Sequence, residues 1–119
     1  MGSPAQDGMT ADRAGLLLLV GVALAGGTVT YQQFADITGG IARGQGPRLN
    51  RIGAACFAAD VPLLSILVVA GDSGLPSTGA SFYADRGILS EEAIRDEIAR
   101  CGSYAWNAED IRRVEEKLE

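Results

Sequence analysis

The sequence of 119 residues contains no histidine. Without an imidazole, the chain can form neither a Ser-His-Asp triad nor a Cys-His pair, and no histidine-ligated zinc site. A few polar residues have a spacing that could suit catalysis, but a role in turns is the favoured interpretation for them: Asp72, Ser73, Tyr83 and Asp85. We therefore expect no enzyme activity, no catalytic residue, no metal and no cofactor.

Cysteines are also scarce. Cys56 and Cys101 lie in segments with helical patterns, and they belong to no disulfide framework. We favour buried, reduced thiols over a disulfide, which agrees with an expected cytoplasmic location.

The sequence lacks an apolar run long enough for a membrane span. The run 14–25 (AGLLLLVGVALA) holds twelve residues, whereas a span needs about 20. A core helix is the favoured interpretation, and we expect no membrane partner. A secretory signal is the alternative, because Ala23-Leu24-Ala25 resembles a cleavage site. Asp12 beside Arg13 leaves the preceding segment without the net positive charge of such a signal.

Charge is unevenly distributed along a chain whose net charge is −5. No acid lies between Asp36 and Asp60, where Arg43, Arg48 and Arg51 give a local excess of positive charge. The segment 85–119 holds ten acids and six bases. The middle of the chain is therefore basic and its end acidic.

The first half of the chain is expected to be helical. Residues 1–9 are interpreted as a disordered leader or an expression remnant, and residues 10–119 as a single domain. A first helix is predicted from an N-cap at Thr10 to the pair Gly26-Gly27. Residues 28–30 predict a short strand that delivers Thr30 as the N-cap of the next helix.

Two short helices are then predicted on either side of a glycine-rich turn. The first covers residues 31–37, with Phe34 and Ile37 facing inward, and the second begins at Pro47. The predicted inner face of the second helix is Leu49, Ile52, Cys56 and Phe57. Its arginines are expected on the exposed face, as in a helix-turn-helix.

The second half of the chain predicts a hairpin and two more helices. Leu64–Val69 reads as a strand, Asp72-Ser73-Gly74 as a turn and Ser81–Tyr83 as the returning strand, with an ordered loop over 75–79 as the wing tip. Two helices are expected to follow, capped by Ser90 and Asn107. The expected fold class is α+β, mainly helical: a winged helix-turn-helix with a β-hairpin wing and two C-terminal helices.

Several motifs occur in a recognisable order over residues 27–83. They are Val29-Thr30-Tyr31 at a helix start, the Gly39-Gly40 turn, the arginine-bearing segment 47–53, the link Val61-Pro62-Leu63 and a glycine-bearing wing over 71–83. This order resembles the DNA-binding half of the O6-alkylguanine DNA alkyltransferase family and its alkyltransferase-like relatives. The resemblance implies that Tyr31 approaches a DNA phosphate and that Arg48 or Arg51 lies on the recognition helix.

The active site of that family is missing. Where the family carries Pro-Cys-His-Arg, this chain has Ile66-Leu67-Val68-Val69, with neither a nucleophilic thiol nor a histidine to activate one. Alkyl transfer is therefore not expected.

Two functions of different classes follow. The first is a non-catalytic winged-helix protein that binds double-stranded DNA weakly, or assists DNA processing, through Tyr31, Arg43, Arg48, Asn50 and Arg51. The alternative is a protein-interaction module, such as an immunity or inhibitor protein, that presents its acidic C-terminal helices to a basic protein partner.

Overall fold

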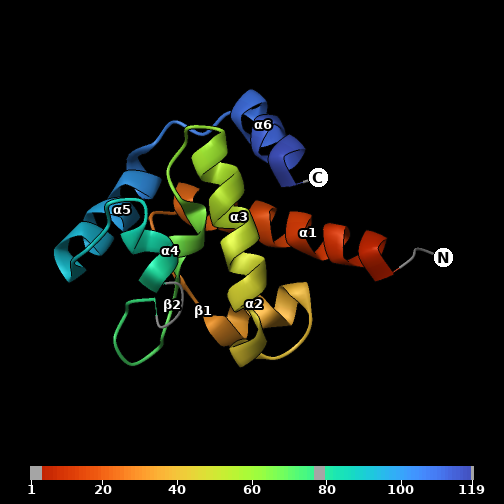
Figure 1. Ribbon diagram of the computed structural model, residues 1–119, viewed down its shortest axis with the longest axis horizontal. Helices are drawn as coiled ribbons and strands as arrows, with labels where there is room; N and C mark the ends of the chain where they lie inside the picture. Colours follow the sequence, from red (N-terminus) through yellow and green to blue (C-terminus); the bar gives the residue numbers. More distant parts are fainter. Residues whose placement is uncertain (1–3, 77–79, 119) are drawn as a thin grey trace.

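The computed structural model describes residues 4–76 and 80–118, and it is mainly helical (Figure 1). The predicted mainly helical α+β class is confirmed at this level. The elements are, in order, α1 (Pro4–Leu24), β1 (Val29–Thr30), α2 (Tyr31–Thr38), η1 (Ala42–Gly44), α3 (Gly46–Ala58), η2 (Leu64–Leu67), β2 (Val68–Val69), α4 (Ala80–Ala84), α5 (Glu91–Ser103) and α6 (Ala108–Leu118).

Helix α1 is the central element, against which α2, α3, η2, α5 and α6 all pack. It begins at Pro4, so Thr10 lies inside the helix and is not its N-cap. Residues 1–3 of the expected leader lie outside the described residues. The end of α1 is as predicted: Gly26 adopts a φ of +71°, and its amide donates to the carbonyl of Ala23 at 2.9 Å. Leu16 and Leu19 are fully buried.

No described helix is both long enough and apolar enough to cross a membrane.

Helix α2 begins where the sequence predicts. The Thr30 hydroxyl accepts a hydrogen bond from the amide of Gln33 at 3.1 Å, and the Gln33 side chain accepts from the amide of Thr30 at 2.9 Å. This reciprocal pair is a capping box. The prediction for Ile37 is wrong, since its side chain is 56% exposed. The buried face of α2 passes through Phe34 and Thr38 instead, because the Thr38 hydroxyl finds partners inside the protein.

Helix α3 carries Pro47 in its first turn, where a missing amide hydrogen costs little. Leu49, Ile52 and Cys56 face the core as predicted. Phe57 does not: it lies outside the buried stripe of α3 and is 57% exposed. Its ring instead lies 5.1 Å from the guanidinium carbon of Arg86.

The predicted wing is wrong. The only strands of the described chain are β1 and β2, which pair in parallel with Val29 opposite Val68. Leu64–Leu67 forms the 3-10 helix η2 and Ser81–Tyr83 lies within α4, so no antiparallel hairpin forms between them. Each residue of η2 is buried, so this run lacks the alternation of buried and exposed residues that is typical of a hairpin strand. The Tyr83 hydroxyl is hydrogen-bonded to Ser65 at 3.0 Å inside the core.

The predicted turn at residues 72–74 is present, with Gly74 at a φ of +70°. Of the expected wing tip, residues 77–79 lie outside the described residues.

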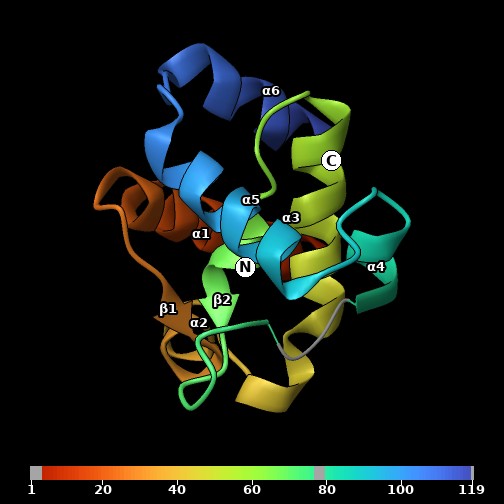
Figure 2. The ribbon, with the colours of Figure 1, turned by 90° about the vertical axis from the view of Figure 1, so that its left-hand side faces the viewer.

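The C-terminal helices follow the sequence prediction. Ser90 caps α5 by accepting from the amide of Ala93 at 3.1 Å, and Asn107 accepts from the amide of Asp110 at 2.8 Å at the start of α6. Figure 2 shows α5 crossing in front of α1, with α6 above it and the β1–β2 pair below. Cys101 of α5 and Cys56 are buried, free thiols, as predicted.

Candidate nucleic-acid interface

The sequence-predicted site residues come from three consecutive elements. Tyr31 is the first residue of α2, where the Thr30 cap sets its position, and its half-buried side chain packs against the core. Arg43 is exposed in η1, and Asn50 is exposed on α3. Arg48 and Arg51 lie one turn apart on α3. Of the five, the structure brings Arg48 and Arg51 together.

A buried carboxylate joins the two arginines. Asp12 of α1 is 5% exposed, and its Oδ1 accepts a hydrogen bond from Nε of Arg48 at 2.9 Å. Arg51 binds the same carboxylate with two donors, Nε to Oδ2 at 2.7 Å and Nη2 to Oδ1 at 3.0 Å. The Arg48 side chain is only 18% exposed, so the expectation that it lies on the exposed face of the helix is wrong. Arg51 remains about half exposed.

Charge pairing sets the protonation of this site. Burial alone would raise the pKa of Asp12, but the hydrogen bonds and positive charges of Arg51 and Arg48 outweigh it and hold the pKa of this carboxyl below its usual value. The hydrogen bond to Asp12 in turn raises the pKa of Arg51. Arg51 therefore stays charged, and the carboxylate cancels part of that charge.

Gln45 connects Arg48 to the glycine-rich turn between α2 and α3. It is 1% exposed, and its Nε2 donates to the carbonyls of Gly39 and Ile41, each at 3.0 Å. Its Oε1 accepts from the Thr38 hydroxyl at 2.9 Å and from Nη1 of Arg48 at 3.2 Å. The Gln45 amide thus fixes the turn between α2 and α3 relative to Arg48. We call Asp12, Gln45, Arg48 and Arg51 the Asp12 cluster.

Sequence reasoning missed two members of this cluster. Gln45 could have been found, because it precedes Arg48 by three residues and so shares a helix face with it. Asp12 gives no such local signal, since it lies 36 residues before Arg48 in the chain.

A second basic residue lines the same hollow as Arg51. A hollow of about 420 Å³ is lined by Arg51, Ala54 and Ala58 of α3 together with Lys117 of α6. Sequence reasoning assigned Lys117 to the acidic end of the chain and overlooked it. Because α6 packs against α3, a lysine from the last turn of the chain's final helix extends the charge of Arg51.

Three of the acids in the last two helices pair within their own helix. Glu91 pairs with Arg95 at 3.0 Å and Glu97 with Arg100 at 3.2 Å on α5, and Asp110 pairs with Arg113 on α6. Glu115 reaches back to Arg13 of α1 at 3.0 Å. Arg48 and Arg51 are therefore balanced by Asp12 of the first helix and not by the acidic end.

The buried thiols lie apart from this interface. Burial raises the pKa of Cys56 to about 12 and also raises the pKa of Cys101, so both thiols are protonated at neutral pH. Among the described residues, no group of histidine, cysteine and acidic side chains is arranged to hold a metal ion.

No family model, curated protein or solved structure matches this chain.

Proposed function

We propose that the chain is a non-catalytic module that binds double-stranded DNA weakly, through a helix-turn-helix made of α2 and α3. The observation that supports this proposal is the half-exposed guanidinium of Arg51, which Asp12 holds in one orientation and which lines the same hollow as Lys117. A guanidinium fixed in advance loses little side-chain entropy when it meets a phosphate. Arg43 and Asn50, both exposed, would add contacts from η1 and α3. Tyr31 at the start of α2 belongs to the same proposal.

The expected affinity follows from the small number of exposed cations. Arg43, Arg51 and Lys117 would neutralise few phosphates, so log K should fall with log salt at a slope of about −3. Binding without sequence preference is expected, with a dissociation constant of about 1–100 μM at physiological salt. The free thiols of Cys56 and Cys101 support placing this activity in the cytoplasm, where thiols stay reduced.

Fluorescence anisotropy with a labelled short duplex at low salt tests the proposal. Lys117→Glu and Arg43→Glu should each weaken binding about fivefold or more, because both lie outside the Asp12 cluster and remove phosphate contacts. Arg95→Glu is the matched control: it makes the same change in net charge on α5, where the side chain is 57% exposed, and should change binding less than about twofold. Absence of binding by the unmodified protein, or an equal loss in the Arg95 variant, would contradict DNA binding.

A protein partner is the second candidate. Leu89 is 77% exposed immediately before α5, and the exposed acids Glu92 and Asp96 lie one turn apart on that helix. An exposed leucine beside acidic side chains suits a basic partner with an apolar patch. A partner-binding role predicts that Leu89→Ser abolishes capture of that partner and leaves anisotropy with DNA unchanged.

A further inference from the structure

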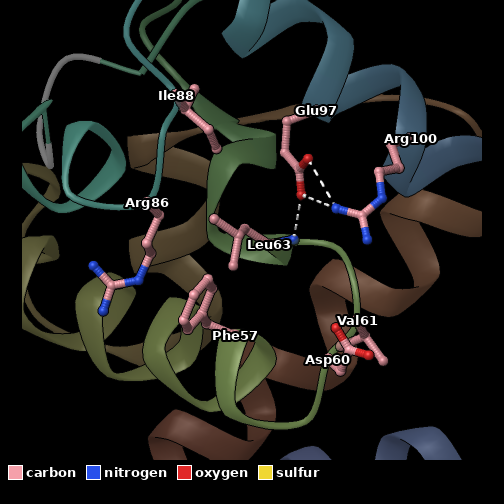
Figure 3. Close-up of a pocket in the computed structure, with 8 residues that line it drawn as sticks. All are labelled: Phe57, Asp60, Val61, Leu63, Arg86, Ile88, Glu97 and Arg100. Atoms are coloured by element: carbon pink, nitrogen blue, oxygen red, sulfur yellow. Dashed lines mark hydrogen bonds and ion pairs between the residues drawn. The ribbon is translucent and has the colours of Figure 1, made fainter.

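A second hollow lies on another part of the surface, where the C-terminal end of α3 meets the segment after α4 and the middle of α5 (Figure 3). Its volume is about 380 Å³, within the range of small-molecule sites, about 300–1,000 Å³. Leu63 forms its floor and is 4% exposed, and Phe57 and Ile88 form apolar walls. The hollow is therefore of suitable size for a small ligand, and its lining combines apolar with charged side chains.

Arg86 lines this hollow and has one donor without a hydrogen-bond partner among the described residues. Its guanidinium carbon lies 3.6 Å from the ring centroid of Phe82 and 5.1 Å from that of Phe57, so the cation is held against two aromatic rings. Nη1 donates to the carbonyl of Phe82 at 2.9 Å. Nε is shut off from solvent and has no hydrogen-bond partner among the described residues. A buried N–H without a partner is rare and costly, which indicates a missing acceptor at this edge.

The opposite wall is already satisfied. Oε2 of the buried Glu97 accepts from the amide of Leu63 at 2.8 Å, and Glu97 also accepts from Arg100. Figure 3 shows this pair and Arg86 on opposite sides of Leu63. The unmet hydrogen-bonding capacity of the hollow therefore lies at Arg86.

The chain turns at the rim of the hollow through the C-terminal end of α3. Asp60 follows the C-cap Ala59 and has a φ of +60°, in the left-handed region that favours glycine. Its amide donates to the carbonyl of Phe57 and the amide of Val61 to that of Cys56, each at 3.1 Å. This bend leads the chain into the floor of the hollow. Figure 3 places Asp60 across Phe57 from Arg86, so its carboxylate does not occupy the Arg86 side.

We propose that this hollow binds a small organic carboxylate with an apolar body. The carboxylate oxygens accept from the Nε and Nη2 edge of Arg86, the fork that matches a carboxylate in two-point contact. The apolar body rests on Leu63 and Ile88. The Phe57 ring, which is 57% exposed and whose centroid lies 5.1 Å from the guanidinium carbon, turns aside to open the Nε edge. This site is independent of the proposed DNA interface.

An NMR titration tests the proposal through the N–H signal of the Arg86 side chain itself. 3-Phenylpropionate is the probe, and 3-phenylpropanamide is the neutral control of the same shape. The carboxylate should shift the Arg86 Nε–H signal with saturation at about millimolar concentration, as expected for so small a ligand. The amide should bind at least about tenfold more weakly, because it lacks the charge that the fork recognises.

Two variants separate the fork from the general charge of the hollow. Arg86→Lys keeps the cation but removes the fork, and it should weaken carboxylate binding about tenfold. Arg100→Gln removes the other cation that lines the hollow and should change binding less than about threefold, because Arg100 already serves Glu97. Equal binding of the acid and the amide, no saturable shift of the Arg86 signal, or full binding by the Arg86→Lys protein would each overturn the proposal.

Discussion

Asp12 on α1 and Arg51 on α3 are 39 residues apart in the chain, yet Nε of Arg51 donates to Oδ2 of Asp12 at 2.7 Å. The same carboxylate holds Arg48. The first helix is thereby fastened to the helix that carries the proposed DNA contacts, so the stability of the fold and the orientation of Arg51 depend on one aspartate.

Removing that aspartate should destabilise the protein. Asp12→Ala leaves Arg48, whose side chain is 18% exposed, without its charged partner, and a buried charge without a partner is costly. We expect a loss of about 2 kcal/mol in the free energy of unfolding, below the full range for buried pairs because Arg51 can be hydrated. Urea unfolding followed by circular dichroism measures it. Glu91→Ala, which breaks an exposed pair with Arg95, should cost less than about 0.5 kcal/mol; equal losses would show that the Asp12 cluster is not special.

The contribution of Asp12 should depend on pH with a defined sign. Its pKa is lowered in the folded protein, so the stabilisation is complete above the pKa of the unfolded chain, about 4, and is lost as the pH falls through the folded value. The difference in unfolding free energy between the unmodified protein and Asp12→Asn should be constant near neutral pH and shrink below about pH 4. Unfolding curves at several pH values check this. A difference that persists unchanged at the acid end would contradict the lowered pKa.

Gly53 should tolerate no side chain. A Cβ there would lie 2.7 Å from Oγ of Ser65 and 2.8 Å from the ring of Phe82, so it would push apart the residues around the buried Ser65–Tyr83 hydrogen bond. Gly53→Ala is expected to lower the unfolding free energy by about 1–3 kcal/mol, as overpacking does.

Gly21 supplies the matched control for Gly53. It lies inside α1, and an added Cβ would meet nothing within 4 Å. Gly21→Ala should therefore stabilise the protein by up to about 1 kcal/mol, the difference in helix propensity. The two thermal midpoints should move in opposite directions, and a shift in the same direction would show that the close approach at Gly53 is not the cause.

The two thiols should be inert in the folded protein. Burial raises the pKa of Cys56 to about 12, and the Cys101 thiol donates to the carbonyl of Leu63 at 3.6 Å in the core. A thiol reagent such as Ellman's should therefore react slowly at about pH 8 and with both cysteines once urea unfolds the chain. Immediate reaction of either cysteine without urea would mean that this part of the core opens readily.

Local signals in the sequence predicted the starts of α2, α5 and α6, although not the start of α1. Thr30, Ser90 and Asn107 cap helices as expected, because a cap involves residues only a few positions apart. The segment Leu64–Val69 could not be resolved in the same way: it is apolar throughout, and an apolar run has no period that separates a strand from a buried 3-10 helix.

The sequence predicted part of one proposed site and nothing of the other. The arginines of α3 stood out because no acid lies near them in the sequence, but their partner Asp12 comes from a distant helix. Arg86 gave no signal at all, because its role depends on Phe57, which the helical pattern had placed in the core. Both sites are formed by contacts between elements that are distant in the chain, and local sequence patterns do not predict such contacts.

The parallel pairing of β1 with β2 also sets an order of events in folding. A hairpin could have closed locally, but Val29 and Val68 are separated in the chain by α2, η1, α3 and η2. Closing so long a loop lowers the chain entropy, and only the contacts formed after closure offset this loss. We therefore expect β1 and β2 to pair late in folding, after the helices between them have packed.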